Sequence, residues 1–222
     1  MPKAVCLVSG GLDSCVSAAV AADSGLDLAF LHISYGQRTQ VRERRAFQEI
    51  ADFYGVQDRL AANLSHLAAI GGSALTDETI DLPQDQVDAE GIPVSYVPFR
   101  NSCLLSVAVG WAEVLGARRV YIGAVEEDSS GYPDCRESFF RAFNVVIREG
   151  TRPESQIKLM TPLIHLRKKA IVEKGLQLGA PLHLTWSCYR DEDLACGHCD
   201  SCLLRLRGFE EAGSEDPIDY AE

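Results

Sequence analysis

The sequence predicts an α/β fold: a doubly wound, mainly parallel sheet with helices on both faces, followed by a C-terminal zinc knuckle and a terminal helix. Three observations lead to this prediction. The chain opens with an apolar segment that runs through a Ser- and Gly-rich turn into a second apolar segment. Apolar strands then alternate with helical patterns, as in parallel βαβ units. Near the C-terminus, four cysteines are gathered between residues 188 and 202.

The first element is expected to be a buried strand over residues 4–8, and residues 15–22 are expected to be helical, with the helix ending near Gly25. In the turn between them, glycines let a phosphate approach the backbone, while the free N–H groups and the dipole of the helix favour negative charge. Serine hydroxyls add donors. We therefore predict a nucleotide-phosphate site made of Val8, Ser9, Gly10, Gly11, Leu12, Asp13 and Ser14.

The order SGGLDS in this turn resembles the pyrophosphate loop of the ATP pyrophosphatases, which split ATP at the α-phosphate. It is not a Walker A loop, because no Gly-Lys-Ser/Thr follows. The alternative is an ordinary strand–turn–helix with a serine cap.

The remaining elements follow from apolar runs, helical spacing and glycine stops. Strands are expected at residues 27–35, 58–64 and 119–125, and helices at 40–55, 101–116, 138–150, 167–179 and 200–212. Ligands of such a sheet bind at the carboxyl ends of its strands, which is where the Ser9–Ser14 turn lies.

Residues 70–98 interrupt the alternation, because they are acidic and rich in Gly, Pro and Asp. A long loop inside a compact domain is usually functional, so we predict a substrate lid, with a plain surface insertion as the alternative. The expected organisation is a nucleotide-binding domain over residues 1–180 and a zinc-binding C-terminal region over 181–222.

The cysteine spacing predicts one structural Zn²⁺ per chain. Four thiolates close the coordination sphere and leave no position for a catalytic water. The predicted ligands are Cys188, Cys196, Cys199 and Cys202, with His198 as a substitute ligand. Two disulfides or free thiols are the alternatives, and the absence of a secretory signal disfavours disulfides.

Composition narrows the function further. The chain has 222 residues, 46% of them hydrophobic, which suits one large or two small domains. Its formal net charge of −11 argues against a nucleic-acid surface. No apolar run has the length of a membrane span, and the expected strand begins almost at once, so we expect no targeting segment and a cytoplasmic location.

Several short polar strings follow expected strands or precede expected helices. They are Tyr35–Arg38, Pro98–Asn101, Glu126–Arg136 and Ile157–Leu163, the last of which contains Lys158. We expect Asn101 to cap the helix that it precedes and Arg100 to point outward.

Together with the turn and the knuckle, these strings make the whole chain resemble the 7-cyano-7-deazaguanine synthase family, which makes the nitrile precursor of queuosine. The strings are SGGLDS at 9–14, SYGQR at 34–38, GGSALTD at 71–77, VPFRN at 97–101, EDSSGYPDCR at 127–136, PLIHL at 162–166, LTWSCY at 184–189 and CGHCDSC at 196–202.

The resemblance implies an ATP-driven conversion of 7-carboxy-7-deazaguanine and ammonia into 7-cyano-7-deazaguanine, through an adenylate and an amide. It implies that the SGGLDS loop holds the pyrophosphate, that Asp13 helps to place Mg²⁺, and that cationic side chains neutralise phosphate charge. The catalytic residues expected on this basis are Asp13, Ser14, Arg100 and Lys158, and Arg38 is a further candidate cation.

The deazaguanine ring needs a stacking surface and a carboxylate for its N–H groups. Tyr35, Phe99 and Tyr132 are the candidate platforms, with core packing as the alternative for each, and Glu126 or Asp134 is the candidate acceptor. The full expected substrate-binding set is Tyr35, Gln37, Arg38, Phe99, Arg100, Asn101, Glu126, Tyr132 and Asp134.

Three alternatives stay open. Cys135 lies beside Arg136, which can lower a thiol pKa, so a sulfur-transferring ATP pyrophosphatase acting on tRNA is one. An enzyme that attaches the deazaguanine to another acceptor is the second, and a zinc-dependent interaction module without catalysis is the third. The expected partners are small molecules, with no nucleic acid and no membrane. The sequence does not decide the oligomeric state, and a homodimer is one arrangement that it allows.

Overall fold

The computed structural model describes residues 1–82, 91–126 and 131–221. Its centre is a five-stranded sheet with the order β3-β2-β1-β4-β5, in which every neighbouring pair is parallel. The strands are β1 (Lys3–Leu7), β2 (Asp27–Ser34), β3 (Asp58–Asn63), β4 (Arg119–Tyr121) and β5 (Lys158–Met160). The predicted fold class is confirmed.

The sheet has its topological switch point between β1 and β4. The chain builds β2 and β3 outward on one side of β1, and then crosses to build β4 and β5 on the other side. Such a switch point opens a crevice at the carboxyl ends of the strands. The turn that follows β1 therefore lies at the mouth of this crevice.

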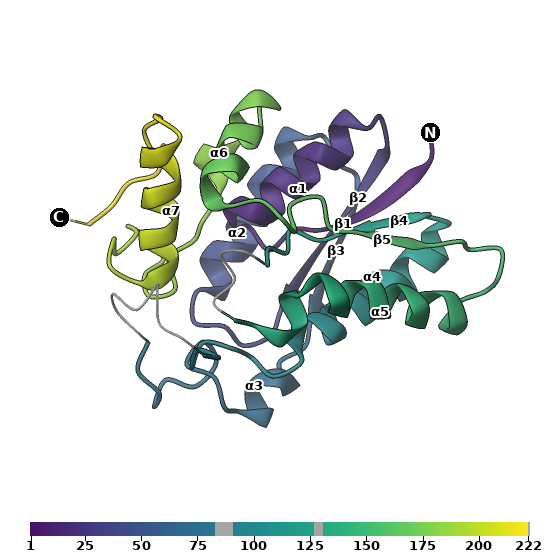
Figure 1. Ribbon diagram of the computed structural model, residues 1–222, viewed down its shortest axis with the longest axis horizontal. Helices are drawn as coiled ribbons and strands as arrows, with labels where there is room; N and C mark the ends of the chain where they lie inside the picture. The colour runs from purple at the N-terminus through teal and green to yellow at the C-terminus, as the bar shows by residue number, and fades with distance from the viewer. Residues whose placement is uncertain (83–90, 127–130, 222) are drawn as a thin grey trace.

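Side-chain alternation along β1 divides the core into two layers. Val5 and Leu7 pack with α4 (Arg100–Leu115) and α5 (Glu137–Gly150). Ala4 and Cys6 pack on the other face of the sheet, with α1 (Leu12–Asp23) and α2 (Gln40–Phe53). Figure 1 shows α1 on one side of the strands and α4 and α5 on the other.

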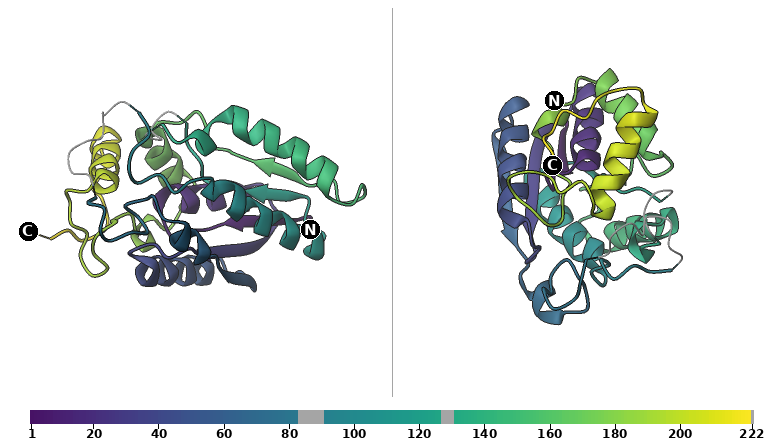
Figure 2. Two further views of the ribbon diagram at one scale, coloured as in Figure 1. Left: turned by 90° about the horizontal axis from the view of Figure 1, so that it is seen from below. Right: turned by 90° about the vertical axis from the view of Figure 1, so that its left-hand side faces the viewer.

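The C-terminal half adds α6 (Lys168–Gln177), which packs on α1, and α7 (Asp200–Glu211), which packs on α6. In the left view of Figure 2, α7 lies at the opposite end of the molecule from the N-terminus. Short helical segments complete the described chain: α3 (His66–Ile70) and the 3-10 turns Pro133–Cys135 and Leu182–Leu184. In the described part of the chain, no helix is long and apolar enough to span a membrane.

The strand predicted over residues 119–125 ends at Tyr121, because the chain leaves the ladder to pass against the turn after β1. A Cβ at Gly123 would lie 2.5 Å from the carbonyl oxygen of Asp13, so only glycine permits this approach. The sequence pattern also did not indicate β5 or α3, which are three and five residues long. Segments of that length carry too few periods of an apolar pattern to be recognised.

The described parts of the predicted lid pack against the core. Ala74, Leu75 and Leu82 join Tyr35 in a buried apolar cluster. Arg38 donates hydrogen bonds to the carbonyl oxygens of Ala74, Asp77 and Ile80, at 2.9, 3.0 and 2.8 Å. Residues 83–90 of the predicted lid lie outside the described residues. A lid motion and the division at residue 180 stay predictions.

Candidate active site at the carboxyl edge of the sheet

The turn after β1 has the geometry of an anion site. Gly11 is the N-cap of α1, and the Ser14 hydroxyl donates to the Gly11 carbonyl oxygen at 2.9 Å. Ser9 and Ser14 lie 3.1 Å apart through their hydroxyl oxygens. Gly10 has φ +98°, and a Cβ there would lie 2.6 Å from the carbonyl oxygen of Glu43. The turn is thus packed tightly against α2 and presents the helix N-terminus outward.

A cavity of about 310 Å³ opens beside this turn. Its walls come from the turn after β1, the C-terminal end of β2, the first residues of α4, the chain after β4, and the C-terminal region. Polar and aromatic side chains of the wall include Ser9, Asp13, Ser14, Tyr35, Glu43, Arg100, Tyr132, Lys168, Trp186, Tyr189 and Arg205. The fold therefore joins the predicted phosphate loop and part of the predicted substrate set in one space.

Asp13, in the predicted phosphate loop (Ser9–Ser14), forms an ion pair that the sequence did not indicate. The Lys168 ammonium, in the first turn of α6, lies 2.8 Å from each carboxylate oxygen of Asp13. Lysine is disfavoured at a helix N-terminus unless a negative group compensates it, and here Asp13 does so. That unusual position was the one signal that sequence reasoning could have used.

Lys158, the predicted catalytic lysine, does not lie in this site. It is the first residue of β5 and pairs with Arg119, the first residue of β4. In a parallel sheet the first residues of the strands lie at the edge opposite to the phosphate loop. The run 157–163 was not recognised as a strand, and so the sequence could not predict at which edge of the sheet Lys158 lies.

Arg100 points inward and not outward as predicted. Its Nη1 donates to the Tyr35 hydroxyl at 3.0 Å, and its guanidinium lies 5.3 Å from the centre of the Tyr35 ring. The Arg100 Nε is buried and has no hydrogen-bond partner among the described residues. Burial alone would lower the pKa of Arg100, but electrostatic interactions with Tyr35, Tyr132 and nearby groups raise the pKa above its ordinary value. The wall therefore holds a permanent cation with one unused donor.

Other predicted substrate residues hold the walls in place. The Asp134 carboxylate accepts the Asn101 backbone N–H at 2.9 Å, and so Asp134, and not Asn101, caps the start of α4. The Glu126 carboxylate accepts the Glu137 N–H at the start of α5, at 3.0 Å. Gln37 lies behind the wall and bonds to Glu43. Neither the Asp134 nor the Glu126 carboxylate is in the lining of the described cavity, whereas Glu43 is.

Two of the three predicted aromatic platforms line the cavity, and the third does not. Tyr35 and Tyr132 line the cavity, and the Tyr132 hydroxyl lies 2.8 Å from that of Ser95. Phe99 is 62% exposed, has φ 57° and lies outside the cavity lining. Residues 127–130 of the predicted Glu126–Arg136 string lie outside the described residues.

The C-terminal region supplies cavity residues that sequence reasoning missed. The Trp186 backbone N–H donates to the Gly10 carbonyl oxygen at 2.8 Å, which joins this region directly to the predicted phosphate loop. Arg42 stacks on the Trp186 ring at 4.6 Å. The other residues that it adds to the wall are Ser187, Tyr189, Ser201, Leu204 and Arg205. The LTWSCY string at 184–189 contains three of these cavity residues, Trp186, Ser187 and Tyr189, but it indicated only the resemblance.

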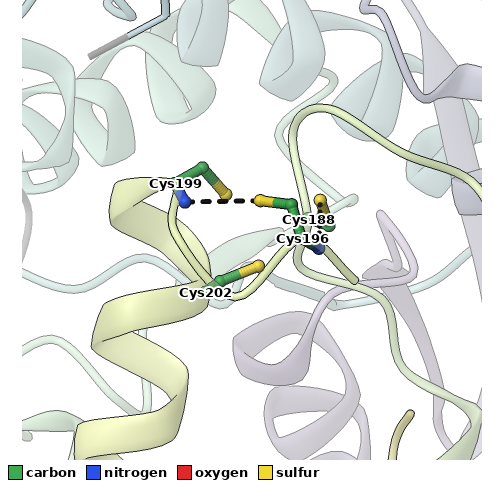
Figure 3. Close-up of side chains that lie close together, drawn as sticks. All are labelled: Cys188, Cys196, Cys199 and Cys202. Carbon is green, nitrogen blue, oxygen red and sulfur yellow. Dashed lines mark hydrogen bonds between the residues drawn. The ribbon is translucent and has the colours of Figure 1, made fainter. Parts of the chain in front are cut away.

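Four cysteines beside the cavity form a cluster that could hold a metal ion. One sulfur from each of Cys188, Cys196, Cys199 and Cys202 lies within 4.8 Å of the others (Figure 3). Within the cluster, hydrogen bonds from Cys199 and Cys202 lower the pKa of Cys188, and the same contacts raise the pKa of Cys202. His198 is exposed and is not a member of the cluster.

Three of the thiols outside the cluster, those of Cys6, Cys15 and Cys135, are buried. Burial raises the pKa of Cys135 to about 11 and that of Cys15 to about 12. All eight cysteines lie in the described chain and none forms a disulfide there. The disulfide alternative is therefore wrong, and Cys135 lacks the lowered pKa that the sulfur-transfer alternative requires.

Comparison with known proteins gives consistent matches. The family model described as "Queuosine biosynthesis protein QueC" matches residues 3–213. A 7-cyano-7-deazaguanine synthase from Chlorobium phaeovibrioides is 57% identical over 218 residues, 98% of this chain and 96% of the relative. Synthases of the same name from Chloroherpeton thalassium (56% identical; 98% and 96%) and Koribacter versatilis (55% identical; 99% and 93%) are similar over nearly the same lengths.

Proposed function

The chain belongs to the QueC family of 7-cyano-7-deazaguanine synthases, enzymes of queuosine biosynthesis, and from this membership we propose that it converts 7-carboxy-7-deazaguanine and ammonia into 7-cyano-7-deazaguanine with ATP as the energy source. One arrangement supports the chemistry most directly. The phosphate loop and the Arg100–Tyr35 wall open on the same cavity. Two reactants held in one cavity can react as if in a single molecule.

A carboxylate is a poor electrophile, so it must be activated first. A carboxylate oxygen of the substrate attacks the α-phosphorus of ATP, the bond to the pyrophosphate oxygen breaks, and pyrophosphate leaves. Ammonia then attacks the carboxyl carbon and AMP leaves, which gives the amide. A second activation at the amide oxygen, followed by loss of AMP and of the N–H protons, leaves the nitrile. Each AMP thus carries away one oxygen of the original carboxylate.

The residues of the loop take defined roles in this sequence. The Ser9 and Ser14 hydroxyls and the N-terminus of α1 bind the phosphates. The Lys168 ammonium neutralises the charge that develops on pyrophosphate as it leaves. Asp13 holds Lys168, and its carboxylate is the kind of ligand that Mg²⁺ takes when it enters with ATP.

Arg100 binds the substrate carboxylate. Its guanidinium is buried against Tyr35 and keeps one unpaired Nε–H. A buried anion requires such a cation, and a guanidinium can hold a carboxylate oriented toward the phosphorus through two parallel hydrogen bonds.

The four-cysteine site is proposed to hold one structural Zn²⁺ per chain. Four sulfurs within 4.8 Å of one another suit a tetrahedral ion with Zn–S bonds of about 2.3 Å. An all-thiolate site leaves no open position, so the ion would contribute folding energy and not chemistry. The free thiols of the chain also favour a reducing compartment such as the cytoplasm. The net charge of −11 favours small-molecule substrates over tRNA.

The test is a single incubation of the pure protein with ATP, Mg²⁺, ammonium and 7-carboxy-7-deazaguanine labelled with ¹⁸O in its carboxyl group. We expect the nitrile, AMP and pyrophosphate, with ¹⁸O recovered in the AMP phosphate by mass spectrometry. Asp13→Asn should abolish product while metal content stays unchanged. Recovery of only ADP and unlabelled phosphate would contradict adenylation.

A further inference from the structure

The cavity wall contains two carboxylates, and their surroundings differ. Both oxygens of Asp13 are engaged by the Lys168 ammonium at 2.8 Å. Glu43, in the first turn of α2, also lines the cavity, but within the described residues it forms no ion pair. Of the two wall carboxylates, Glu43 is therefore the one that no cation of the described residues contacts directly.

Glu43 is held in one orientation by two buried neighbours. The Thr39 hydroxyl donates to Oε1 at 3.1 Å and also lies 3.3 Å from the Cys188 carbonyl oxygen, and the Gln37 amide donates to Oε2 at 2.9 Å. Thr39 is 2% exposed and Gln37 is 4% exposed. The Gln37 carbonyl oxygen accepts the Tyr35 N–H at 2.8 Å, which fixes the amide so that its NH₂ faces Glu43. Each oxygen of Glu43 thus receives one bond from the protein and keeps a further acceptor position.

A pair of parallel acceptors matches one part of a guanine-like ring. Such a ring carries an N1–H and a 2-amino group side by side, and a carboxylate can accept both. On the basis of the substrate proposed above, we propose that Glu43 is the residue that recognises this edge: its carboxylate accepts the N1–H and 2-amino hydrogen bonds and selects guanine-like heterocycles. The acceptors expected from sequence, Glu126 and Asp134, are used instead to bond the backbone at the starts of α5 and α4.

The charge state of Glu43 provides an independent signature. Burial raises its pKa to about 7, and hydrogen bonds from Gln37 and Thr39 and the charge of Arg100 lower the pKa only in part. Glu192, the other charged neighbour, raises it. Two N–H donors from a ligand stabilise the ionised form and lower the pKa. Binding of the heterocycle near pH 7 should therefore release part of a proton.

Calorimetry on the metal-loaded protein without ATP tests this assignment. The two ligands are 7-carboxy-7-deazaguanine and 7-carboxy-7-deazahypoxanthine, which lacks only the 2-amino group. Because a hydrogen bond to a charged group is lost, we expect the wild type to bind the second ligand roughly 10- to 100-fold more weakly. Glu43→Gln should weaken binding of the first ligand and reduce the discrimination to below about threefold, because an amide NH₂ opposes the ring donors.

Asp52→Asn is the matched control, since Asp52 lies on the same helix and pairs with Arg59 outside the cavity. It should discriminate like the wild type. ATP binding and metal content show whether Glu43→Gln is folded. If it is not, proton release by the wild type decides: the guanine-like ligand should release more at pH 7 than the analogue.

Three outcomes overturn the assignment: wild type that binds both ligands equally, Glu43→Gln that still discriminates, or equal proton release for the two ligands. A wild type that neither binds nor converts the carboxylate would instead contradict the proposed function itself. A variant that binds and discriminates normally but forms no amide would place Glu43 in the chemistry and not in recognition.

Discussion

Two residues separated by 155 positions in the chain meet at the phosphate loop. Asp13 follows β1, whereas Lys168 begins α6, and their side chains form a pair with two contacts of 2.8 Å. A carboxylate beside incoming phosphates would repel them. The lysine offsets that repulsion before ATP binds, and it can turn to the phosphates afterwards because its three N–H donors move freely.

Replacement of Lys168 by methionine tests this role and keeps the apolar stem of the side chain. We expect kcat/KM for ATP to fall by at least about 100-fold, because one charge that stabilises the leaving pyrophosphate is lost. Steady-state release of pyrophosphate measures it. Lys158→Met is the matched control and should react like the wild type, since Lys158 lies at the other edge of the sheet. Equal losses in the two variants would contradict the assignment.

At the scale of elements, helix α7 supports the active site from behind. It begins at the cysteine cluster, lines the cavity with Ser201 and Arg205, and passes beneath the Lys168 side chain at Gly208. A Cβ at Gly208 would lie 2.4 Å from Lys168 Cγ and 3.3 Å from its backbone carbon. The helix therefore has no side chain at the point where the lysine must lie against it.

Gly208→Ala should displace Lys168 and lower kcat by roughly tenfold or more, while the metal content and the helical circular dichroism signal stay unchanged. A displacement of about 1 Å is enough for such a loss. Gly110→Ala in α4 provides the comparison, because a Cβ there meets nothing within 4 Å. That exposed helical position should gain about 0.5–1 kcal/mol in the free energy of unfolding and keep its activity. If Gly208→Ala also keeps full activity, the helix does not position the lysine.

At the scale of the whole molecule, buried hydrogen bonds connect the region of the cysteine cluster to the turn that follows β1 of the sheet. The buried Arg205 pairs with Asp216 at 2.7 Å and donates to the Thr185 hydroxyl at 2.7 Å, which ties α7 to the chain before and after it. Trp186 then bonds to Gly10 of the phosphate loop. The cysteine cluster, the cavity wall and the loop are thus joined through a few buried contacts.

Removal of the metal should therefore affect substrate binding as well as stability. Cys199→Ser should release the metal and lower the free energy of unfolding by several kcal/mol, because metal binding contributes to folding. Binding of the carboxylate should be lost with it. Metal analysis, denaturant unfolding and calorimetry measure the three effects. Cys103→Ser, outside the cluster, should keep the metal. A metal-free protein with unchanged stability would contradict a structural role.

The amino-acid sequence alone was enough for the features that depend on neighbours along the chain. Short-range periodicity and turn chemistry predicted the strand before the Ser9–Ser14 turn, the helix after it and the parallel α/β class. The spacing of the four cysteines predicted that they would cluster. The resemblance to the family also rested on short contiguous motifs of the sequence. The fold class and the family were confirmed.

Only the tertiary structure placed Lys168, Glu43 and Trp186 in the cavity, turned Arg100 inward and put Lys158 at the far edge. The physical reason is common to all of them. Which residue faces a site depends on strand direction and on how a helix packs against the sheet, and these are decided by contacts between segments far apart in the chain. A local pattern indicates the type of element, but the folded chain alone decides which side chains meet.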